Sequence, residues 1–424
     1  MSSTVAVAGK PRALLLCYLC SPEHGSEPGV GWNQAVAVAD AFDVTVITLD
    51  DERYRPAIER RLAASDAPPI KFVFVPKTLR ELRLTQVSWL YYVTLHRWHQ
   101  RAFDIARQLH AEQPFDLVHQ VNLCGYREPG LLWRLGPPFI WGPVGGTQNI
   151  PTQFFSEFGL AEALAERTRN CLNRLQLRWS SRVRRAATSA ACFLAANQLV
   201  QRELEENLQV RPELLLETGV REVGAPRKWS GANRPLRIFW SGNLVARKGP
   251  TLFLKALGRL KDQLPFEAVI LGRGPDEARL KRLTEQLGIA KQVSFRGFLP
   301  HAEAVQLNAW ADVFVFTSLR DTSGTVVLEA MSRGLPVIVL DHQGVHDIVT
   351  EGAGVKIPLT NPTQVVSDIA AAIEHLARDS AAWERLSARG VTRARDYLWS
   401  RRAEVIQGIY RRVLAANRAA PAPM

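Results

Sequence analysis

Short apolar runs alternate with segments of helical periodicity along the chain. In the first half, each run is followed by a loop rich in glycine, proline or polar residues, which is typical of buried strands. These runs predict strands at residues 13–20, 43–49, 72–76, 116–121, 139–146 and 192–198. Helices are predicted from about Gln34 to Ala41 and from about Leu79 to Ala111. Strands that alternate with helices indicate a parallel sheet.

The second half repeats this pattern. Strands are predicted at 236–242, 266–274, 292–298, 312–318 and 336–340, and helices at Thr251–Gln263, Asp276–Leu287 and His301–Ala309. A segment rich in Gly, Pro and charge, 221–235, has the composition of a linker. Because 424 residues can bury two cores, we predict an α/β protein with two doubly wound, Rossmann-like domains, 1–222 and 223–400. Ligands of such sheets bind at the carboxyl ends of the strands.

Composition and charge indicate a globular protein with anionic partners. Hydrophobic residues make up 46% of the chain and charged residues 22%, and the net charge is +12, with 43 arginines and 10 lysines. This excess favours nucleotide phosphates, nucleic acid or acidic lipid without choosing among them. Nucleic acid is the weakest of the three, because the chain has no RNA- or DNA-binding motif.

The cysteines and apolar runs predict a cytoplasmic protein. Five cysteines at irregular spacing argue against a disulfide framework. Cys17 and Cys20 lie in a predicted strand, where residues three apart point to opposite faces. The amino terminus lacks the apolar segment of a signal peptide, and no apolar run is long enough to span a bilayer. We therefore expect a cytosolic protein or one attached to a membrane surface.

The sequence RDTSGTVVLEAMSRG, residues 320–334, predicts a phosphate site. It follows a buried strand, and it changes from a loop to helical spacing after RDTSG. If Ser323 or Thr322 is the N-cap, the amides from Gly324 to Val327 are unpaired donors at the positive end of a helix dipole. Such a helix terminus binds phosphate groups.

Two carboxylates flank this helix terminus. Glu329, one turn into the helix, can accept hydrogen bonds from ribose hydroxyls, and Asp321 can reach hydroxyls on a sugar. The structural alternative is that Asp321 caps the helix and Glu329 forms an exposed ion pair.

A basic pair is predicted at the same edge of the second sheet. IFWSGNLVARKG places a strand, a glycine turn and then Arg247 and Lys248 before an amphipathic helix. Two cations in this loop can stabilise the charge of a departing phosphate. The alternative is a pair of surface charges, although cations are unfavourable at a helix start.

These motifs, taken together, resemble a known enzyme family. IFWSGNLVARKG, VILGRGPDEARLKRL, VSFRGFLP and SLRDTSGTVVLEAMSRGLPVIVL resemble, in order and spacing, the donor-domain motifs of the family 4 retaining glycosyltransferases of the GT-B fold. SEPGVGWN, FDLVHQV, LLWRLGPPFIWGPVGG and LAANQ resemble one bacterial subgroup. The resemblance implies two domains facing a central cleft, and a closing helix and tail, 401–424, that crosses back to the first domain.

The resemblance also implies roles for individual residues in binding a nucleotide-sugar donor. The family's two glutamates, separated by seven residues, correspond to Asp321 and Glu329, which would bind the transferred sugar and the ribose. Lys248 would neutralise the leaving diphosphate. The remaining implied donor contacts are the amides of Thr325 and Val326 to the diphosphate, Gly242 and Gly324, and Gly297 in the base-binding loop. Asn243 stands where the family usually has an arginine, so either Arg247 supplies that charge or the donor site is weakened.

First-domain residues are implied to lie at the cleft on the acceptor side. Gly29 and Gly31 are expected in a flexible loop after the first strand, with backbone amides near the donor phosphates. The expected acceptor contacts are Glu27, Trp32 and Arg127. His119 matches part of a family motif and is a catalytic candidate. The alternative for His119 is a structural role at a strand end.

The chain contains no D-x-D triplet, the usual acidic clasp for a divalent metal. We therefore expect a metal-independent reaction without a cofactor, in which the helix terminus and basic side chains stabilise the leaving group. The family retains the anomeric configuration, and the resemblance implies front-face attack with no enzymic nucleophile.

Two basic stretches, 80–101 and 167–185, combine arginine with apolar or aromatic residues. Such helices suit an anionic membrane surface, and a lipid-linked acceptor at the inner leaflet would follow. The alternative is solvated charge over a core-facing stripe.

Two further alternatives concern the whole protein: a nucleotide-sugar epimerase on the same scaffold, or a degenerate protein that only binds sugar nucleotide or a partner.

Overall fold

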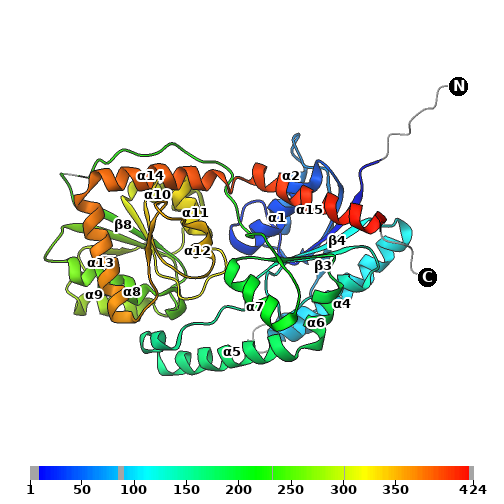
Figure 1. Ribbon diagram of the computed structural model, residues 1–424, viewed down its shortest axis with the longest axis horizontal. Helices are drawn as coiled ribbons and strands as arrows, with labels where there is room; N and C mark the ends of the chain where they lie inside the picture. Colours follow the sequence, from blue (N-terminus) through cyan, green and yellow to red (C-terminus); the bar gives the residue numbers. More distant parts are fainter. Residues whose placement is uncertain (1–8, 85–89, 232, 300, 420–424) are drawn as a thin grey trace.

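The computed structural model describes residues 9–84, 90–231, 233–299 and 301–419. Within these residues the chain forms two parallel sheets in two side-by-side lobes, each covered by helices (Figure 1). The predicted α/β class with two Rossmann-like domains is confirmed.

The first sheet has the strand order β3-β2-β1-β4-β5-β6-β7. Its central strands are buried along their whole length, as expected of a parallel sheet with helices on both faces. The order reverses between β1 and β4, which is the topological switch point of a doubly wound sheet. The bounds are β1 Arg12–Cys17, β2 Asp43–Asp50, β3 Ile70–Pro76, β4 Leu117–Asn122, β5 Phe139–Val144, β6 Cys192–Ala195 and β7 Glu213–Leu214.

The second sheet has the order β10-β9-β8-β11-β12-β13, the same winding as the first. Its switch point lies between β8 and β11, which pair in parallel through Val313 and Phe314 against Ile238 and Phe239. The loops that follow these two strands therefore meet at one edge of the sheet. The bounds are β8 Leu236–Ser241, β9 Phe266–Leu271, β10 Val293–Phe295, β11 Val313–Phe316, β12 Val337–Leu340 and β13 Val355–Ile357.

Helices cover both sheets. Those of the first lobe are α1 Ser26–Ala39, α2 Arg55–Leu62, α3 Leu79–Leu84, α4 Tyr91–Glu112, α5 Leu160–Trp179, α6 Ser181–Ser189 and α7 Gln198–Leu208. Those of the second lobe are α8 Pro250–Leu260, α9 Glu277–Gln286, α10 His301–Trp310, α11 Thr325–Ser332, α12 Gln343–Ile348, α13 Pro362–Arg378 and α14 Ser380–Arg395. Helix α15, Trp399–Ala419, follows α14 and returns to the first lobe, where it packs beside α1 (Figure 1).

Gly29 and Gly31 are not in a flexible loop, contrary to the sequence prediction. Helix α1 begins at Ser26, and both glycines are buried in its first two turns. A Cβ on Gly31 would lie 2.3 Å from the carbonyl oxygen of Leu19. The helix therefore needs glycine to pack against the loop after β1, and a Gly- and Pro-rich start concealed its helical character.

The stretch 167–185 is not one continuous helix. Helix α5 ends at Trp179, and α6 begins two residues later. Ser180 separates them in an extended conformation, and its hydroxyl accepts a hydrogen bond from the amide of Val183 at 3.4 Å. An N-cap serine inside the basic run thus starts a second helix.

The replacement Gly31→Ala tests the close packing of α1. We expect the free energy of unfolding to fall by about 1–3 kcal/mol, because the added methyl group must displace backbone or the Asn122 side chain. Gly408→Ala in α15 is the matched control, since a Cβ there meets no atom within 4 Å, and alanine favours a helix by roughly 0.5–1 kcal/mol. Chemical denaturation of both variants measures the difference; equal stabilities would contradict the packing argument.

Candidate active site

Lys248 and Asp321 form an ion pair at the switch point of the second sheet. Lys248 ends a short 3-10 helix, Ala246–Lys248, after β8, and Asp321 lies in the loop after β11. The Lys248 ammonium contacts Oδ2 of Asp321, and both side chains are largely buried, at 15% and 19% exposure. The predicted phosphate cation and the predicted sugar-binding carboxylate are thus in direct contact.

Gly249 makes this arrangement possible. Its φ is +65°, and a Cβ there would lie 2.1 Å from the carbonyl oxygen of Thr317. The Thr317 hydroxyl in turn donates to the carbonyl of Gly249 at 2.8 Å. The chain can therefore turn tightly after Lys248 and present its side chain to the loop after β11.

The other oxygen of Asp321 caps helix α11. Its Oδ1 accepts a hydrogen bond from the amide of Gly324 at 3.1 Å. Burial alone would raise the pKa of Asp321, but the charge and hydrogen bond of Lys248, with the Gly324 amide and the charge of Arg247, outweigh it and lower the pKa. Asp321 is therefore a carboxylate at neutral pH, and its capping role coexists with the ion pair.

The N-cap of α11 is Gly324, not Ser323 or Thr322 as predicted. Gly324 has φ +68° and packs against Val345, so that a Cβ would lie 2.3 Å from Cγ1 of that residue. The first helical amides, those of Thr325 and Val326, have no intrahelical acceptor by their position. The helix therefore presents two donors at its positive end, beside the Lys248–Asp321 pair.

Glu329 is not in an exposed ion pair, which corrects the structural alternative for this residue. It lines a cavity of about 20 Å³ with Ser241, Asn308 and Val326, which has room for about one water molecule. Burial raises the pKa of Glu329 to about 7, and the charge of Arg333 opposes the rise only in part. A buried carboxyl group without a full counter-charge suits hydrogen bonding to hydroxyls.

The other donor-side residues lie on neighbouring loops. Gly242 follows β8 directly, and the next residue, Asn243, is exposed. Arg247 donates to the carbonyl of Arg320 at 3.4 Å, so its guanidinium faces the same loop as Lys248. Gly297 follows β10 with φ +64°.

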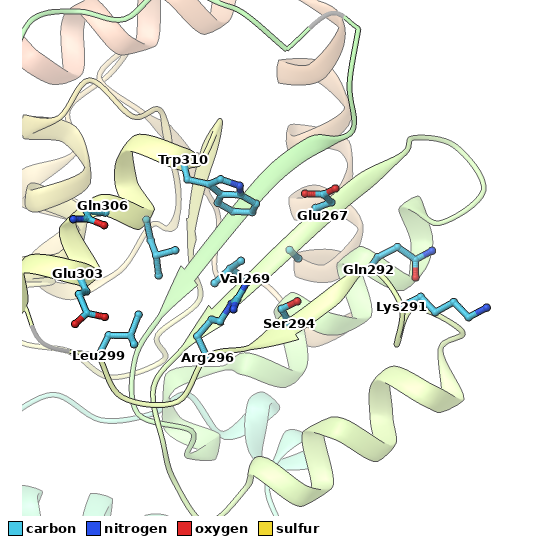
Figure 2. A pocket seen from close by; sticks show the side chains of 12 residues that line it. Glu267, Val269, Lys291, Gln292, Ser294, Arg296, Leu299, Glu303, Gln306 and Trp310 are labelled. Carbon is cyan, nitrogen blue, oxygen red and sulfur yellow. The ribbon is translucent and has the colours of Figure 1, made fainter.

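A cavity of about 730 Å³ lies beside this last loop (Figure 2). Figure 2 shows its walls, which come from β9, β10 and α10 and include Trp310 and Glu303. Arg296 and Leu299, on either side of Gly297 and Phe298, reach its edge. Its lining contains none of the predicted site residues, so the cavity adjoins the predicted base-binding loop without including it.

Two first-domain predictions are wrong. His119 is fully buried, with one ring nitrogen 2.6 Å from the Tyr410 hydroxyl and the other 2.6 Å from the carbonyl of Gly142. Burial lowers its pKa to about 4, so it is a neutral structural link between β4 and α15 and not a catalytic residue. Trp32 is also buried and stacks on Phe72, 5.9 Å between ring centroids, where no acceptor can reach it.

Glu27 and Arg127 are each held by residues of the first domain. Glu27 is in the first turn of α1 and accepts a hydrogen bond from the amide of Cys124 at 3.2 Å. Burial raises its pKa. Arg127, in the loop after β4, donates to Gln176 at 2.8 Å and also to Asn173.

Glu217 is a site residue that the sequence analysis missed. It is 7% exposed and lies just before the crossing to the second domain. Its neighbour Thr218 accepts a hydrogen bond from Thr325, the first residue of α11, at 3.1 Å. Oε2 of Glu217 has no hydrogen-bond partner among the described residues. The only sequence signal was a lone acid at the end of the apolar run LLL.

Several charges act on Glu217. Burial first, and then the charges of Glu27 and Asp321, raise the pKa of Glu217 to about 8, against the opposing effect of the Ser323 hydroxyl. Arg402, from α15, is the nearby cation. The carboxyl groups of Glu27 and Asp321 thus both lie near that of Glu217.

Residues 226–390 match the family model of group 1 glycosyl transferases. This domain belongs to that family. The resemblance predicted from the donor-domain motifs is confirmed. The match contains the Lys248–Asp321 pair and Glu329 and lies wholly outside the first domain, residues 1–222.

Relatives of the glycosyl transferase domain include a D-inositol 3-phosphate glycosyltransferase of Paenarthrobacter aurescens, 31% identical over 42% of this chain and 44% of the relative. The putative colanic acid biosynthesis glycosyltransferase WcaL of Escherichia coli is 31% identical over 37% of this chain and 41% of the relative. The chain therefore spans less than half the length of these two relatives.

Solved structures match nearly the whole chain. HepE of Anabaena, in complex with UDP and glucose, has a TM-score of 0.62 and 16% identity over 96% of this chain and 100% of that one. WaaG, a glycosyltransferase involved in lipopolysaccharide biosynthesis, has a TM-score of 0.58 and 17% identity over 93% and 100%. At this identity the likeness shows the fold, which is that of GT-B glycosyltransferases.

The buried carboxyl group of Glu217 predicts a pH-dependent stability. Its folded-state pKa lies above the ordinary 4.5, so its contribution is present below pH 4.5 and is lost as pH rises towards 8. The loss is at most about 1.4 kcal/mol per pH unit. Glu217→Gln removes this loss, so the free energy of unfolding of the variant should fall less between pH 5 and 8 than that of the wild type. Denaturant titrations at three pH values measure it, and parallel curves would contradict it.

Proposed function

We propose that this protein transfers a sugar from a nucleotide-diphosphate donor to an acceptor, with retention at the anomeric carbon and without a metal ion. The observation that carries the proposal is the meeting of Lys248, Asp321 and the α11 amides at the switch point of the second sheet. Cations and helix amides together suit a diphosphate, and the carboxylate suits sugar hydroxyls. The family match over 226–390 supports the proposal.

Each group then has one role. The amides of Thr325 and Val326 bind the diphosphate, and Glu329 binds the ribose. Lys248 and Arg247 stabilise the charge that develops on the leaving phosphate. Asp321 orients the transferred sugar through lone pairs that Lys248 and the Gly324 amide leave free.

The reaction needs no enzymic nucleophile. The acceptor oxygen attacks the anomeric carbon from the face that the diphosphate leaves, and the departing phosphate oxygen takes the acceptor proton. The bond to the acceptor forms as the bond to the phosphate breaks, so the configuration is retained. Contact with the carboxylate of Asp321 holds the Lys248 ammonium beside the leaving phosphate.

A thermal-shift panel of UDP-glucose, UDP-galactose, UDP-N-acetylglucosamine and GDP-mannose tests donor binding. UDP sugars come first, because the neighbour HepE was solved with UDP and with UDP-glucose. A ligand that binds only the folded state raises the melting temperature. If none of these nucleotide sugars raises the melting temperature, the proposed donor binding is wrong.

Lys248→Ala should lower kcat by roughly 10²- to 10³-fold, the usual effect of removing one stabilising group from the transition state. Release of nucleoside diphosphate in the presence of acceptor measures turnover, and release that does not require an acceptor would point to an epimerase or hydrolase. Lys281→Ala, in an exposed ion pair with Glu277, is the control. Lys248→Arg, which keeps the charge, separates catalysis from the cost of leaving Asp321 unpaired. Full activity of Lys248→Ala would refute the assigned role.

We also propose that the first domain docks on an anionic membrane surface at the cytoplasmic face, which suits a lipid-linked acceptor. Helix α5 exposes a run of apolar side chains, among them Leu164, Leu175 and Trp179, at 67%, 50% and 73% exposure. Exposed arginines, including Arg174 and Arg178, accompany them. Of the stretch 80–101, residues 85–89 lie outside the described residues, and Tyr92 and Val93 are exposed. None of the described helices is long and apolar enough to cross a membrane.

Co-sedimentation with vesicles tests this docking. We expect salt-sensitive binding to vesicles containing phosphatidylglycerol, weak binding to pure phosphatidylcholine, and no comparable binding to duplex DNA. The double variant Leu175→Ser, Trp179→Ser should lose most of the binding. Val405→Ser, an exposed apolar position on α15, should not. Binding that is unaffected by the double variant would show that α5 is not the docking face.

A further inference from the structure

Four arginines gather where the two domains meet. Arg127 follows β4 and Arg169 lies on α5, whereas Arg247 and Arg320 come from the loops after β8 and β11. Burial first, and then the charges of Arg320 and Arg127, lower the pKa of Arg169 to about 10. Burial and the charges of Arg247 and Arg127 lower the pKa of Arg320, against the effect of Glu166. Arg320 is therefore close enough to repel each of the other three guanidinium groups, and Arg127 also repels Arg169.

Neutral groups hold three of these arginines in place. Arg169 donates to the carbonyls of Gln148 at 2.9 Å and Gly146 at 3.2 Å. Arg127 donates to the side chains of Gln176 and Asn173, and Arg247 to the carbonyl of Arg320. These acceptors fix the orientation of the guanidinium groups without cancelling their charge.

The acids near the cluster do not balance it. Arg320 forms an ion pair with Glu166. Glu203, near Arg169, is the second acid, and burial raises its pKa. Asp321 is already paired with Lys248. Four guanidinium groups against two acids leave an excess of two positive charges, and the three that remain when Arg247 is assigned to the donor still exceed the two acids by one.

Three guanidinium groups suit a phosphate better than a carboxylate, because a phosphate offers three acceptor oxygens. A phosphate monoester carries about −1.5 to −2 charges at neutral pH, whereas a carboxylate carries one. Arginine binds phosphate oxygens through two parallel N–H groups. The cluster is also open to a ligand, because Arg127, Arg169 and Arg247 are only partly buried.

The position of the cluster favours the acceptor as the source of the phosphate. Glu166, Arg169, Asn173 and Gln176 recur every three or four residues and so lie along one face of α5, which belongs to the first domain. Figure 1 shows α5 running along the lower edge of the first lobe toward the second. The donor diphosphate already has the α11 amides, Lys248 and Arg247.

We propose that Arg127, Arg169 and Arg320 bind a phosphate group carried by the acceptor, next to the donor site. The inference rests on the proposed function and adds the chemical class of the second substrate. Phosphate on the acceptor would also fix its orientation, since Arg320 directly precedes the sugar-binding Asp321.

Calorimetric titration with glucose 6-phosphate, glucuronate and glucose tests the inference. We expect glucose 6-phosphate to bind at least tenfold more tightly than either of the others. Arg127→Gln should weaken it by about tenfold, and Arg127→Lys, which keeps the charge but not the fork, by less. Arg107→Gln, an exposed arginine on α4 with the same loss of charge, should have no effect. Melting temperatures of all variants establish that each is folded.

Three results would overturn the inference. The first is equal binding of glucose 6-phosphate to the wild type and Arg127→Gln, or no binding to either. The second is tighter binding of glucuronate. The third is binding that is lost in Lys248→Ala but kept in Arg127→Gln, which would place the phosphate in the donor site.

The nucleotide-sugar panel separates this failure from failure of the proposed function. If a nucleotide sugar stabilises the protein and glucose 6-phosphate does not bind, only the acceptor inference is wrong. If glucose 6-phosphate binds at the arginines and no nucleotide sugar binds, the cluster is an anion site outside a transferase, and both proposals are wrong.

Discussion

The ion pair between Lys248 and Asp321 is the contact on which the candidate site depends. It joins the loops after β8 and β11, the two strands where the winding of the second sheet reverses. Both charges are largely buried, so each needs the other; removing one partner leaves an uncompensated charge in a low-dielectric site. Because Asp321 also holds the amide of Gly324, the pair fixes the start of α11 and the direction of its free amides.

The first domain is built against this same loop. Asn197 donates from its side chain to the carbonyl of Thr322 at 2.9 Å, and Thr325 donates to Thr218 at 3.1 Å. The segment around Thr218 is held in turn by the returning α15, whose Arg402 donates to the carbonyl of Leu216. Helix α15 thus helps to hold the segment that contacts α11, although Arg402 and Leu216 lie nearly two hundred residues apart in the sequence.

The local arrangement of charges says more about ligand binding than the net charge of +12 does. Most arginines of the chain are paired or solvated, as Arg12, Arg55 and Arg412 show. At the domain junction, by contrast, guanidinium groups are oriented by neutral carbonyls and amides, and their mutual repulsion remains. Partly buried, unpaired guanidinium groups lower the stability of the protein when no anion is bound. The arrangement therefore indicates a ligand site and not a stabilising contact.

The sequence by itself determined the fold class and singled out the residues of the candidate site in the second domain. Apolar runs and helical periodicity report burial directly, so the central strands and α8 to α10 were predicted within a few residues. Three of the four residues, Arg247, Lys248 and Asp321, could be found because they lie in loops that directly follow predicted strands. Glu329 could be found because it lies one turn into the helix that follows such a loop. Short edge strands such as β7 and β13 carry too few residues for a pattern, and Gly and Pro at the start of α1 concealed a helix.

Only the tertiary structure decided which groups meet. His119 and Trp32 had residue types that suit a binding site, but both point into the core. The sequence could not show this, because the apolar pattern of a strand or helix does not tell which other elements pack against it. Glu217, Arg169 and Arg320 come from different elements, and long-range packing alone brings them beside Asp321 or Arg127. Sequence spacing describes neighbours along the chain, whereas burial, pKa shifts and charge balance depend on neighbours in space.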